Sequence, residues 1–232
     1  MSVMAVPPAP PPDPWLFPTP GPAGFATADL ADLPDDGTHY ELADGVLLAT
    51  RPGGLTVADL DRIPGGDGNS YELVDGMLVV SPAPTVAHQF VAARLTALLT
   101  AACPADLFVF GASPAVQKGR RSSVEPDVTV ARMADLRLDG PYTGVPVLVV
   151  EVLSPSSVAL DRVVKRSVYA QLGVPFYWIV DPSPPRGPAV TVLRLDTDGG
   201  YRKDVIAGPH DTVAVQDPFP VAFRPADLRE RG

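Results

Sequence analysis

Apolar residues recur with helical spacing in two segments of the chain. In residues 86–102 they fall on one face, at Ala87, Val91, Leu95, Leu98 and Ala102. This stripe with a period of 3.6 residues predicts a helix packed against a core. A second helix is predicted over residues 161–172, because Gly173 follows and glycine is the usual residue just beyond a helix end.

Shorter apolar runs predict strands around these helices. Residues 147–153 are almost wholly apolar, which is typical of a central strand buried on both faces. A hairpin is predicted across Asp198-Gly199-Gly200, between residues 190–195 and 201–206. Further strands are expected at 107–110, 115–117, 128–130 and 176–180, with short pieces near Val213 and Val221. This order of elements predicts a mixed α/β (α+β) layer fold.

One helix-and-hairpin unit occurs twice in the first third of the chain. Ala28-Asp29-Leu30 precedes Tyr40-Glu41-Leu42-Ala43-Asp44-Gly45, and Ala58-Asp59-Leu60 precedes Tyr71-Glu72-Leu73-Val74-Asp75-Gly76. Asp-Gly between two apolar runs is a strong signal for a tight hairpin. Each unit therefore predicts a short helix followed by a β-hairpin. Only the second unit continues into the helix at 86–102, so the first is interpreted as a hairpin added to a sheet edge, or as decoration.

Prolines dominate the start of the chain and set the expected domain boundaries. Nine of them fall within residues 1–24, a density that neither a helix nor a sheet ladder tolerates. We therefore expect a disordered proline-rich arm at 1–24, a partial duplicate extension at 25–55 and the main domain at 56–232.

Overall charge and composition narrow the class of protein. The net charge of −9 does not suit a general nucleic-acid coat, because phosphate binding depends on Lys and Arg. A local basic surface is expected at the turn with Lys118, Arg120 and Arg121, although solvated surface charges are an equal alternative.

The single cysteine, Cys103, favours a reducing compartment. With neither a secretory signal nor 18 consecutive apolar residues, the protein is expected to be cytoplasmic and to have no membrane contact.

Two carboxylates and one lysine are the candidate chemical groups. Asp127 directly precedes the strand at 128–130, and Glu151 directly follows the apolar run 147–150. If those two strands pair, both acids would converge on one Mg²⁺ ion, which is held by one or two carboxylates together with water and substrate. Lys165 lies beside the apolar stripe of the second helix and would orient a water or offset developing negative charge. This set points to hydrolysis of a phosphodiester.

Structural explanations of the same residues remain open at this point. Glu151 could pair with an arginine, and Asp127 could be a turn residue after Pro126. Asp161 and Lys165 have the i, i+4 spacing of a helix-surface salt bridge. Because structural ion pairs imitate metal sites, the spacing of these residues alone does not decide whether they form a metal site or structural ion pairs.

Several short motifs follow one another in order between residues 71 and 182. They are Tyr71-Glu72-Leu73-Val74-Asp75-Gly76, Ser81-Pro82, His88, Glu125-Pro126-Asp127, Val150-Glu151-Val152-Leu153-Ser154-Pro155-Ser156-Ser157, Asp161 with Lys165, and Gly173-Val174-Pro175-Phe176-Tyr177-Trp178-Ile179-Val180-Asp181-Pro182. Together they resemble the Uma-two family of restriction-endonuclease-like proteins, of the PD-(D/E)XK nuclease superfamily, over about residues 56–228. The resemblance implies a restriction-endonuclease-like core, a mixed central β-sheet flanked by helices, with extra N-terminal and C-terminal β-hairpins.

The resemblance also implies roles for individual residues. Asp127 and Glu151 match two acidic metal ligands, with the Val152 carbonyl as a further oxygen. The lysine expected two residues after the second acid is replaced by Leu153, and Lys165 on the following helix takes its place.

Two further residues are matched as auxiliary groups. Glu72 matches an acidic position that helps to order the metal, with a carboxylate bonded to backbone amides as the alternative. His88 would contact a phosphate, or would be a satisfied histidine at a helix start.

Two functional hypotheses follow. The first is a DNA endonuclease with Asp127, Glu151 and Lys165 as catalytic residues, Mg²⁺ as cofactor (or Mn²⁺ as its substitute), and the turn at 118–121 on the DNA backbone. A homodimer is also expected, since cleavage of both strands usually needs two sites. The second is a catalytically silent nuclease-fold interaction or assembly protein, whose proline-rich arm binds a protein partner.

Overall fold

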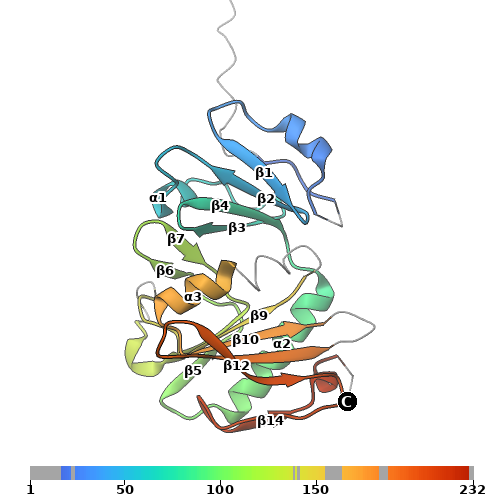
Figure 1. Ribbon diagram of the computed structural model, residues 1–232, viewed down its shortest axis with the longest axis vertical. Coiled ribbons are helices and arrows are strands. Elements are labelled where there is room, and N and C mark those ends of the chain that lie inside the picture. Colours follow the sequence, from blue (N-terminus) through green and yellow to red (C-terminus); the bar gives the residue numbers. More distant parts are fainter. Residues whose placement is uncertain are drawn as a thin grey trace, which may run out of the picture.

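The computed structural model describes residues 17–21, 24–137, 139, 142–154, 164–182 and 188–229. Within these residues, two six-stranded sheets and a small two-stranded sheet form the framework of the molecule (Figure 1). None of the helices in the described part of the chain is long and apolar enough to cross a membrane. Residues 1–16 and Asp161, on which sequence-based expectations were placed, lie outside the described residues.

The first sheet contains both copies of the duplicated unit and has the order β1-β2-β4-β3-β7-β6. Its strands are β1 (His39–Ala43), β2 (Val46–Thr50), β3 (Asn69–Val74), β4 (Met77–Pro82), β6 (Val116–Lys118) and β7 (Ser122–Val124). Both Asp-Gly hairpins are confirmed, since β1 pairs with β2 and β3 pairs with β4 in antiparallel register. Asp44 and Asp75 both have φ of 49°, as the two-residue turn requires. The first hairpin joins the second through β2 and β4.

The second sheet has the order β12-β11-β10-β9-β8-β5. Its strands are β5 (Leu107–Phe110), β8 (Val128–Arg132), β9 (Leu148–Val152), β10 (Phe176–Asp181), β11 (Ala189–Leu195) and β12 (Tyr201–Ala207). Only the β9–β10 pair is parallel, and the remaining pairs are antiparallel. Every residue of β9 is buried, which confirms the central strand expected from its apolar run.

Short helices and one long helix cover these sheets. They are η1 (Thr27–Asp32), α1 (Val57–Leu60), α2 (Val86–Ala102), η2 (Met133–Asp135), α3 (Arg166–Leu172) and η4 (Pro225–Leu228). The small sheet consists of β13 (Val213–Val215) paired with β14 (Val221–Phe223). The α2 bounds agree with the sequence prediction, and the Thr85 hydroxyl caps its start by accepting from the His88 N–H. Helix α3 ends at Gly173, with φ of 78°.

Three apolar cores hold the layers together. Helix α2 packs on one face of the second sheet, with Leu95 and Leu99 fully buried. Helix α3 lies between the two sheets and buries Val168 and Tyr169 there (Figure 1). The third core lies on the other face of the first sheet, under η1 and α1, and includes Phe25. The cavity described below is lined by residues of both sheets and of α2.

The prediction for the segment around the basic turn was incomplete. The sequence suggested that strands at 115–117 and 128–130 flank this turn, but β6 pairs with β7, and β8 belongs to the other sheet. Strand β7 is only Ser-Ser-Val, too short to show an alternating pattern.

Candidate active site

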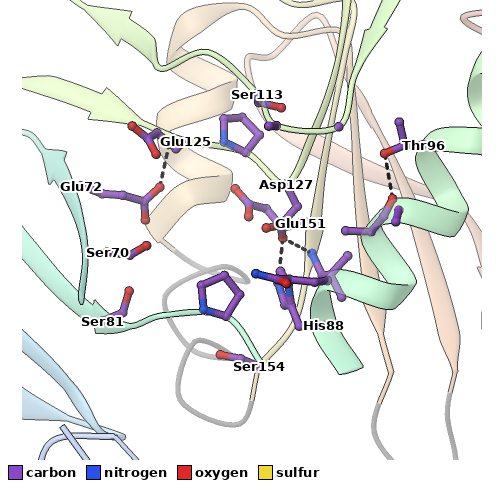
Figure 2. Close-up of a pocket in the computed structure, with 18 of the residues that line it drawn as sticks. Ser70, Glu72, Ser81, His88, Thr96, Ser113, Glu125, Asp127, Glu151 and Ser154 are labelled. Atoms are coloured by element: carbon purple, nitrogen blue, oxygen red, sulfur yellow. Dashed lines mark hydrogen bonds and ion pairs between the residues drawn. The ribbon is translucent and has the colours of Figure 1, made fainter. Parts of the chain in front are cut away.

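A cavity of about 710 Å³ opens beside the first sheet, the second sheet and α2 (Figure 2). Small residues form much of its α2 side, among them Ala92, Ala93 and Ala97. Its ionisable lining among the described residues is Glu72, His88, Glu125, Asp127, Glu151 and Lys165. The three residues predicted as catalytic therefore line one cavity, together with both residues predicted as auxiliary.

Strand pairing brings Asp127 and Glu151 together. In the β8–β9 ladder Val128 is the partner of Val150, so one further step of the same register sets Asp127 opposite Glu151. Oδ2 of Asp127 accepts a hydrogen bond of 2.7 Å from the Val152 N–H across the two strands. The two acids were expected to converge only if these strands pair, and β8 and β9 do pair.

The side chain of Asp127 is fixed from two directions. Besides the Val152 N–H, the Nε2 atom of His88 lies 3.1 Å from Oδ2, and Figure 2 shows both contacts converging on the carboxylate. His88 comes from the first turn of α2 and is buried. Both contacts use Oδ2, so His88 and the β9 backbone hold the carboxylate in place.

Lys165 reaches the same site from the start of α3. Its Nζ atom lies 3.2 Å from Oε1 of Glu151 and 3.0 Å from Oε2 of Glu72. All three side chains are less than one tenth exposed. Burial of this kind requires that charges be paired, and here one ammonium is shared by two carboxylates. The structural alternative pairs Lys165 with Asp161, which lies outside the described residues, so that pair stays a prediction.

Tyr169 is a site residue that the sequence reasoning missed. Its hydroxyl donates a hydrogen bond of 2.5 Å to Oε1 of Glu151, the oxygen that also faces Lys165. Burial and the nearby Glu151 carboxylate raise the pKa of Tyr169 well above its ordinary value, so it stays a protonated donor. The signal in the sequence was its position four residues after Lys165, which puts both side chains on one helix face.

Glu72 and Glu125 form the other side of the site. Oε1 of Glu72 accepts a 2.8 Å hydrogen bond from the Glu125 N–H, while Oε2 faces Lys165. Glu72 is thus bonded to a backbone amide, as its structural alternative expects, and is also ion-paired, while its role in ordering a metal stays a prediction. Burial and the neighbouring Glu72 raise the pKa of Glu125, and Lys165 opposes this effect.

The residues predicted to contact a DNA backbone lie elsewhere. Lys118, Arg120 and Arg121 are exposed on the β6–β7 hairpin, and none of them is among the described residues that line the cavity. The Lys118 ammonium donates to the Gln171 side chain at 2.9 Å. The Arg121 guanidinium donates to the Asp75 carbonyl at 3.0 Å and therefore supports the turn of the second hairpin.

The donor set is sparse for a metal ion. In the described part of the chain, no group of three or more His, Cys, Asp or Glu side chains could hold one. Asp127, Glu151 and Val152 nevertheless line one cavity. Two carboxylates completed by water and substrate are the donor type that suits Mg²⁺, whereas Ca²⁺ takes six to eight oxygens. The residues present therefore fit a magnesium-type site.

Comparisons with known proteins identify the family and a similar fold. The Uma2 family model, described as "Putative restriction endonuclease", matches residues 57–229. The fold is similar to the crystal structure of "a putative nuclease belonging to DUF820" from Anabaena variabilis, with a TM-score of 0.59 and 18% sequence identity. That similarity covers 75% of this chain and 97% of the other. No curated protein matches the chain.

The family match covers the second hairpin, α2, both candidate acids and Lys165, and it extends over most of the chain. The mixed α+β fold expected from the sequence is confirmed by its structural neighbour. The protein belongs to the Uma2 family of restriction-endonuclease-like proteins.

Proposed function

We propose that the protein is a metal-dependent DNA endonuclease that hydrolyses phosphodiester bonds at the cavity around Asp127. The observation that carries this proposal is the meeting of Asp127, Glu151 and Lys165, which come from three separate elements, on one cavity. Membership of a family described as restriction endonucleases supports the same reaction class.

Asp127, Glu151 and the Val152 carbonyl would hold the metal ion. When bound, a divalent cation such as Mg²⁺ neutralises charge on the phosphate and makes a bound water more acidic. The chain itself keeps the carboxylates in place, since His88 and the Val152 N–H hold Asp127, and Tyr169 holds Glu151.

Lys165 supplies the positive charge of the site. Its ammonium lies beside Glu151, where it would donate to an attacking water or to an oxygen that gains negative charge. Glu72 holds the ammonium from the other side and is itself held by the Glu125 N–H. In this proposal, Glu72 positions Lys165, and His88 positions Asp127.

Substrate holding would fall mainly to residues outside the cavity. Among the described lining residues, Lys165 and His88 face four carboxylates, so the cavity itself offers little attraction for a polyanion. The exposed side chains of Lys118, Arg120 and Arg121 are our candidates for contacts with the DNA backbone. The homodimer, the cytoplasmic location and a protein partner for the proline-rich arm stay predictions.

A second candidate function is favoured by one specific observation. Lys165 is already paired with both Glu72 and Glu151, so these two buried carboxylates have a counter-charge without a metal ion. Such a cluster would also suit a catalytically silent interaction or assembly protein that keeps the nuclease fold.

The decisive experiment replaces Asp127 by Asn, which keeps an oxygen to accept from the Val152 N–H but removes the charge. We expect wild-type protein to nick supercoiled plasmid with Mg²⁺ or Mn²⁺. Asp127→Asn should lower both nicking and Mn²⁺ affinity by about 100-fold or more. The matched control is Asp61→Asn, at an exposed position outside the cavity, which should behave as wild type.

Three outcomes separate the candidates. Equal nicking by wild type and Asp127→Asn contradicts the assignment of the active site. Mn²⁺ binding that depends on Asp127 without DNA cleavage points to another phosphodiester substrate. If wild-type protein shows neither binding nor cleavage, the silent interaction protein is the better description.

A further inference from the structure

The two helix-and-hairpin units are equivalent in their contacts as well as in their sequence. We define unit 1 as residues 24–50 and unit 2 as residues 54–81. The Phe25 N–H donates to the Gly45 carbonyl at 2.9 Å, and the Leu55 N–H donates to the Gly76 carbonyl at 2.7 Å. The two units therefore fold in the same way, each closed by a hydrogen bond from its entry to its Asp-Gly turn.

The starts of the two short helices repeat as well. The Ala26 N–H donates to the Asp29 carboxylate at 2.6 Å, and the Thr56 N–H donates to the Asp59 carboxylate at 2.9 Å. The repeat thus extends from the helix start to the hairpin.

The pairing between the units is symmetric. Residues of the first hairpin have their counterparts 31 positions later, so Leu48 corresponds to Val79. Leu48 and Val79 are themselves register partners in the β2–β4 ladder. On either side, Leu47 pairs with Val80, and Ala49 pairs with Leu78. Leu78 is the counterpart of Leu47 and Val80 is that of Ala49, so an exchange of the two units converts one pair into the other. A local two-fold axis therefore passes between Leu48 and Val79.

The apolar core over the units follows the same symmetry. Counterparts from both units contribute to it, namely Phe25 and Leu55, Leu42 and Leu73, Leu47 and Leu78, Ala49 and Val80, Leu30 and Leu60, Leu33 and Ile63, and Tyr40 and Tyr71. An interface in which each side contributes the same surface is isologous, the type found between two copies in a symmetric dimer. Here both halves belong to one chain.

Only unit 2 is part of the family region, which begins at residue 57. Without unit 1, the edge of β4 and the apolar side chains Leu73, Leu78 and Val80 would face solvent. An open strand edge beside an apolar face is a template for pairing with another chain. Unit 1 covers this surface and is a near copy of unit 2. The partner that fits the surface in the same way is therefore unit 2 of a second molecule.

We propose that unit 1 occupies, within one chain, the surface through which unit 2 would pair with unit 2 of a second molecule. Unit 1 is thus an internal cap on a self-association surface formed by β4 and the apolar face beside it. Its acidic residue agrees with this role, since Glu41, the counterpart of Glu72, is exposed and its carboxylate pairs with His39 of the same strand. Unit 1 has kept the interface, and none of its residues is among the described residues that line the cavity around Asp127.

The test removes the cap by changing unit 1 alone. Ala49 is fully buried in unit 1, and Ala43 of the same unit is exposed, so Ala49→Glu and Ala43→Glu form a matched pair. Both are placed in full-length protein with Cys103→Ser and Val79→Cys, which makes residue 79 the only cysteine. Leu48 is both the counterpart of Val79 and its register partner. If unit 2 of a second molecule replaced unit 1, residue 79 of one copy would therefore lie opposite residue 79 of the other.

We expect Ala43→Glu to keep the mass of the wild-type protein by light scattering and to give no disulfide crosslink through residue 79 on mild oxidation. Ala49→Glu should double its mass as concentration rises and should crosslink through residue 79. A second variant, Leu48→Pro, disrupts β2, the strand of unit 1 that pairs with β4, but leaves the side chains of the shared apolar core unchanged. It should give the same crosslinked dimer.

The proposal is overturned if neither variant crosslinks more than Ala43→Glu. It is also overturned if both variants unfold completely by circular dichroism, because unit 1 would then belong to the folding core and would not stand in for a second copy. Neither readout depends on nuclease activity, so the result is independent of the proposed function.

Discussion

The Nζ atom of Lys165 lies 3.2 Å from Oε1 of Glu151, although the two residues belong to different elements of the fold. Glu151 sits on the central strand β9, and Lys165 is at the start of α3. The position two residues after the acid, where a lysine could have followed on the same strand, is Leu153 in this chain. The ammonium therefore reaches the carboxylate from a helix, and Leu153 is free to be a buried core residue.

Replacement of Lys165 by Met should lower stability and activity together. It leaves the buried carboxylates Glu72 and Glu151 without their shared cation, and loss of one partner from a buried pair costs about 3–5 kcal/mol. Urea unfolding and plasmid nicking measure the two effects. Glu72→Gln/Lys165→Met should recover part of the stability without recovering nicking. Full nicking by Lys165→Met would show that the lysine is structural.

Tyr169→Phe isolates the hydroxyl that holds Glu151. The ring still packs on Tyr177, at 5.1 Å between centroids, so the protein should fold with a loss of about 1–3 kcal/mol. We expect weaker Mn²⁺ binding and slower nicking, because Glu151 is less well held. The control is Tyr201→Phe, which removes another hydroxyl with a buried hydrogen bond, to the Val174 carbonyl away from the cavity. Equal nicking by both variants would exclude a positioning role for Tyr169.

The stabilising effect of the Tyr169 hydroxyl should also depend on pH in a defined direction. Its pKa is raised in the folded protein, so the stability it contributes is complete below pH 10 and is lost as pH rises through the folded pKa. The difference in unfolding free energy between wild type and Tyr169→Phe should therefore stay constant from pH 7 to 9. A difference that falls within that range contradicts the donor assignment.

Glu72→Gln and Glu41→Gln form a matched pair at equivalent positions of the two units. Glu72 is buried against Lys165, whereas Glu41 is exposed. Glu72→Gln should reduce nicking by releasing one side of the lysine, and Glu41→Gln should leave nicking and stability unchanged. Nicking assays on both proteins test this directly. Loss of nicking in Glu41→Gln would mean that unit 1 takes part in the reaction.

Glu125→Gln should stabilise the protein at neutral pH. Burial and Glu72 raise the pKa of Glu125 above its ordinary 4.5. Its favourable contribution is therefore complete below pH 4.5 and is lost as pH rises through the folded pKa, where the ionised group becomes unfavourable. Chemical unfolding between pH 4 and 8 should show a higher stability of Glu125→Gln at pH 8 that disappears toward pH 4. A gap that is independent of pH would contradict this linkage.

Much of the fold could be predicted because its signals are local. The Asp-Gly turns fix two hairpins through backbone conformations that only a few residues adopt, and α2 follows from the spacing of its apolar residues. Strand β7 was missed because Ser-Ser-Val carries no periodic signal. Asp127, Glu151 and Lys165 were predicted as a site, but their meeting depended on the pairing of β8 with β9, which spacing alone does not determine.

The sequence by itself determined the two hairpins and the apolar strand β9, since turn chemistry and periodicity act over a few neighbouring residues. It did not distinguish Glu41 from Glu72, which share the motif Tyr-Glu-Leu-x-Asp-Gly. Tertiary structure decided their difference, because β3 is flanked by β4 and β7 and borders the cavity that Lys165 reaches, whereas β1 is at the edge of its sheet. The same carboxylate is solvated in one place and paired with a buried ammonium in the other, because its environment comes from elements distant in the chain.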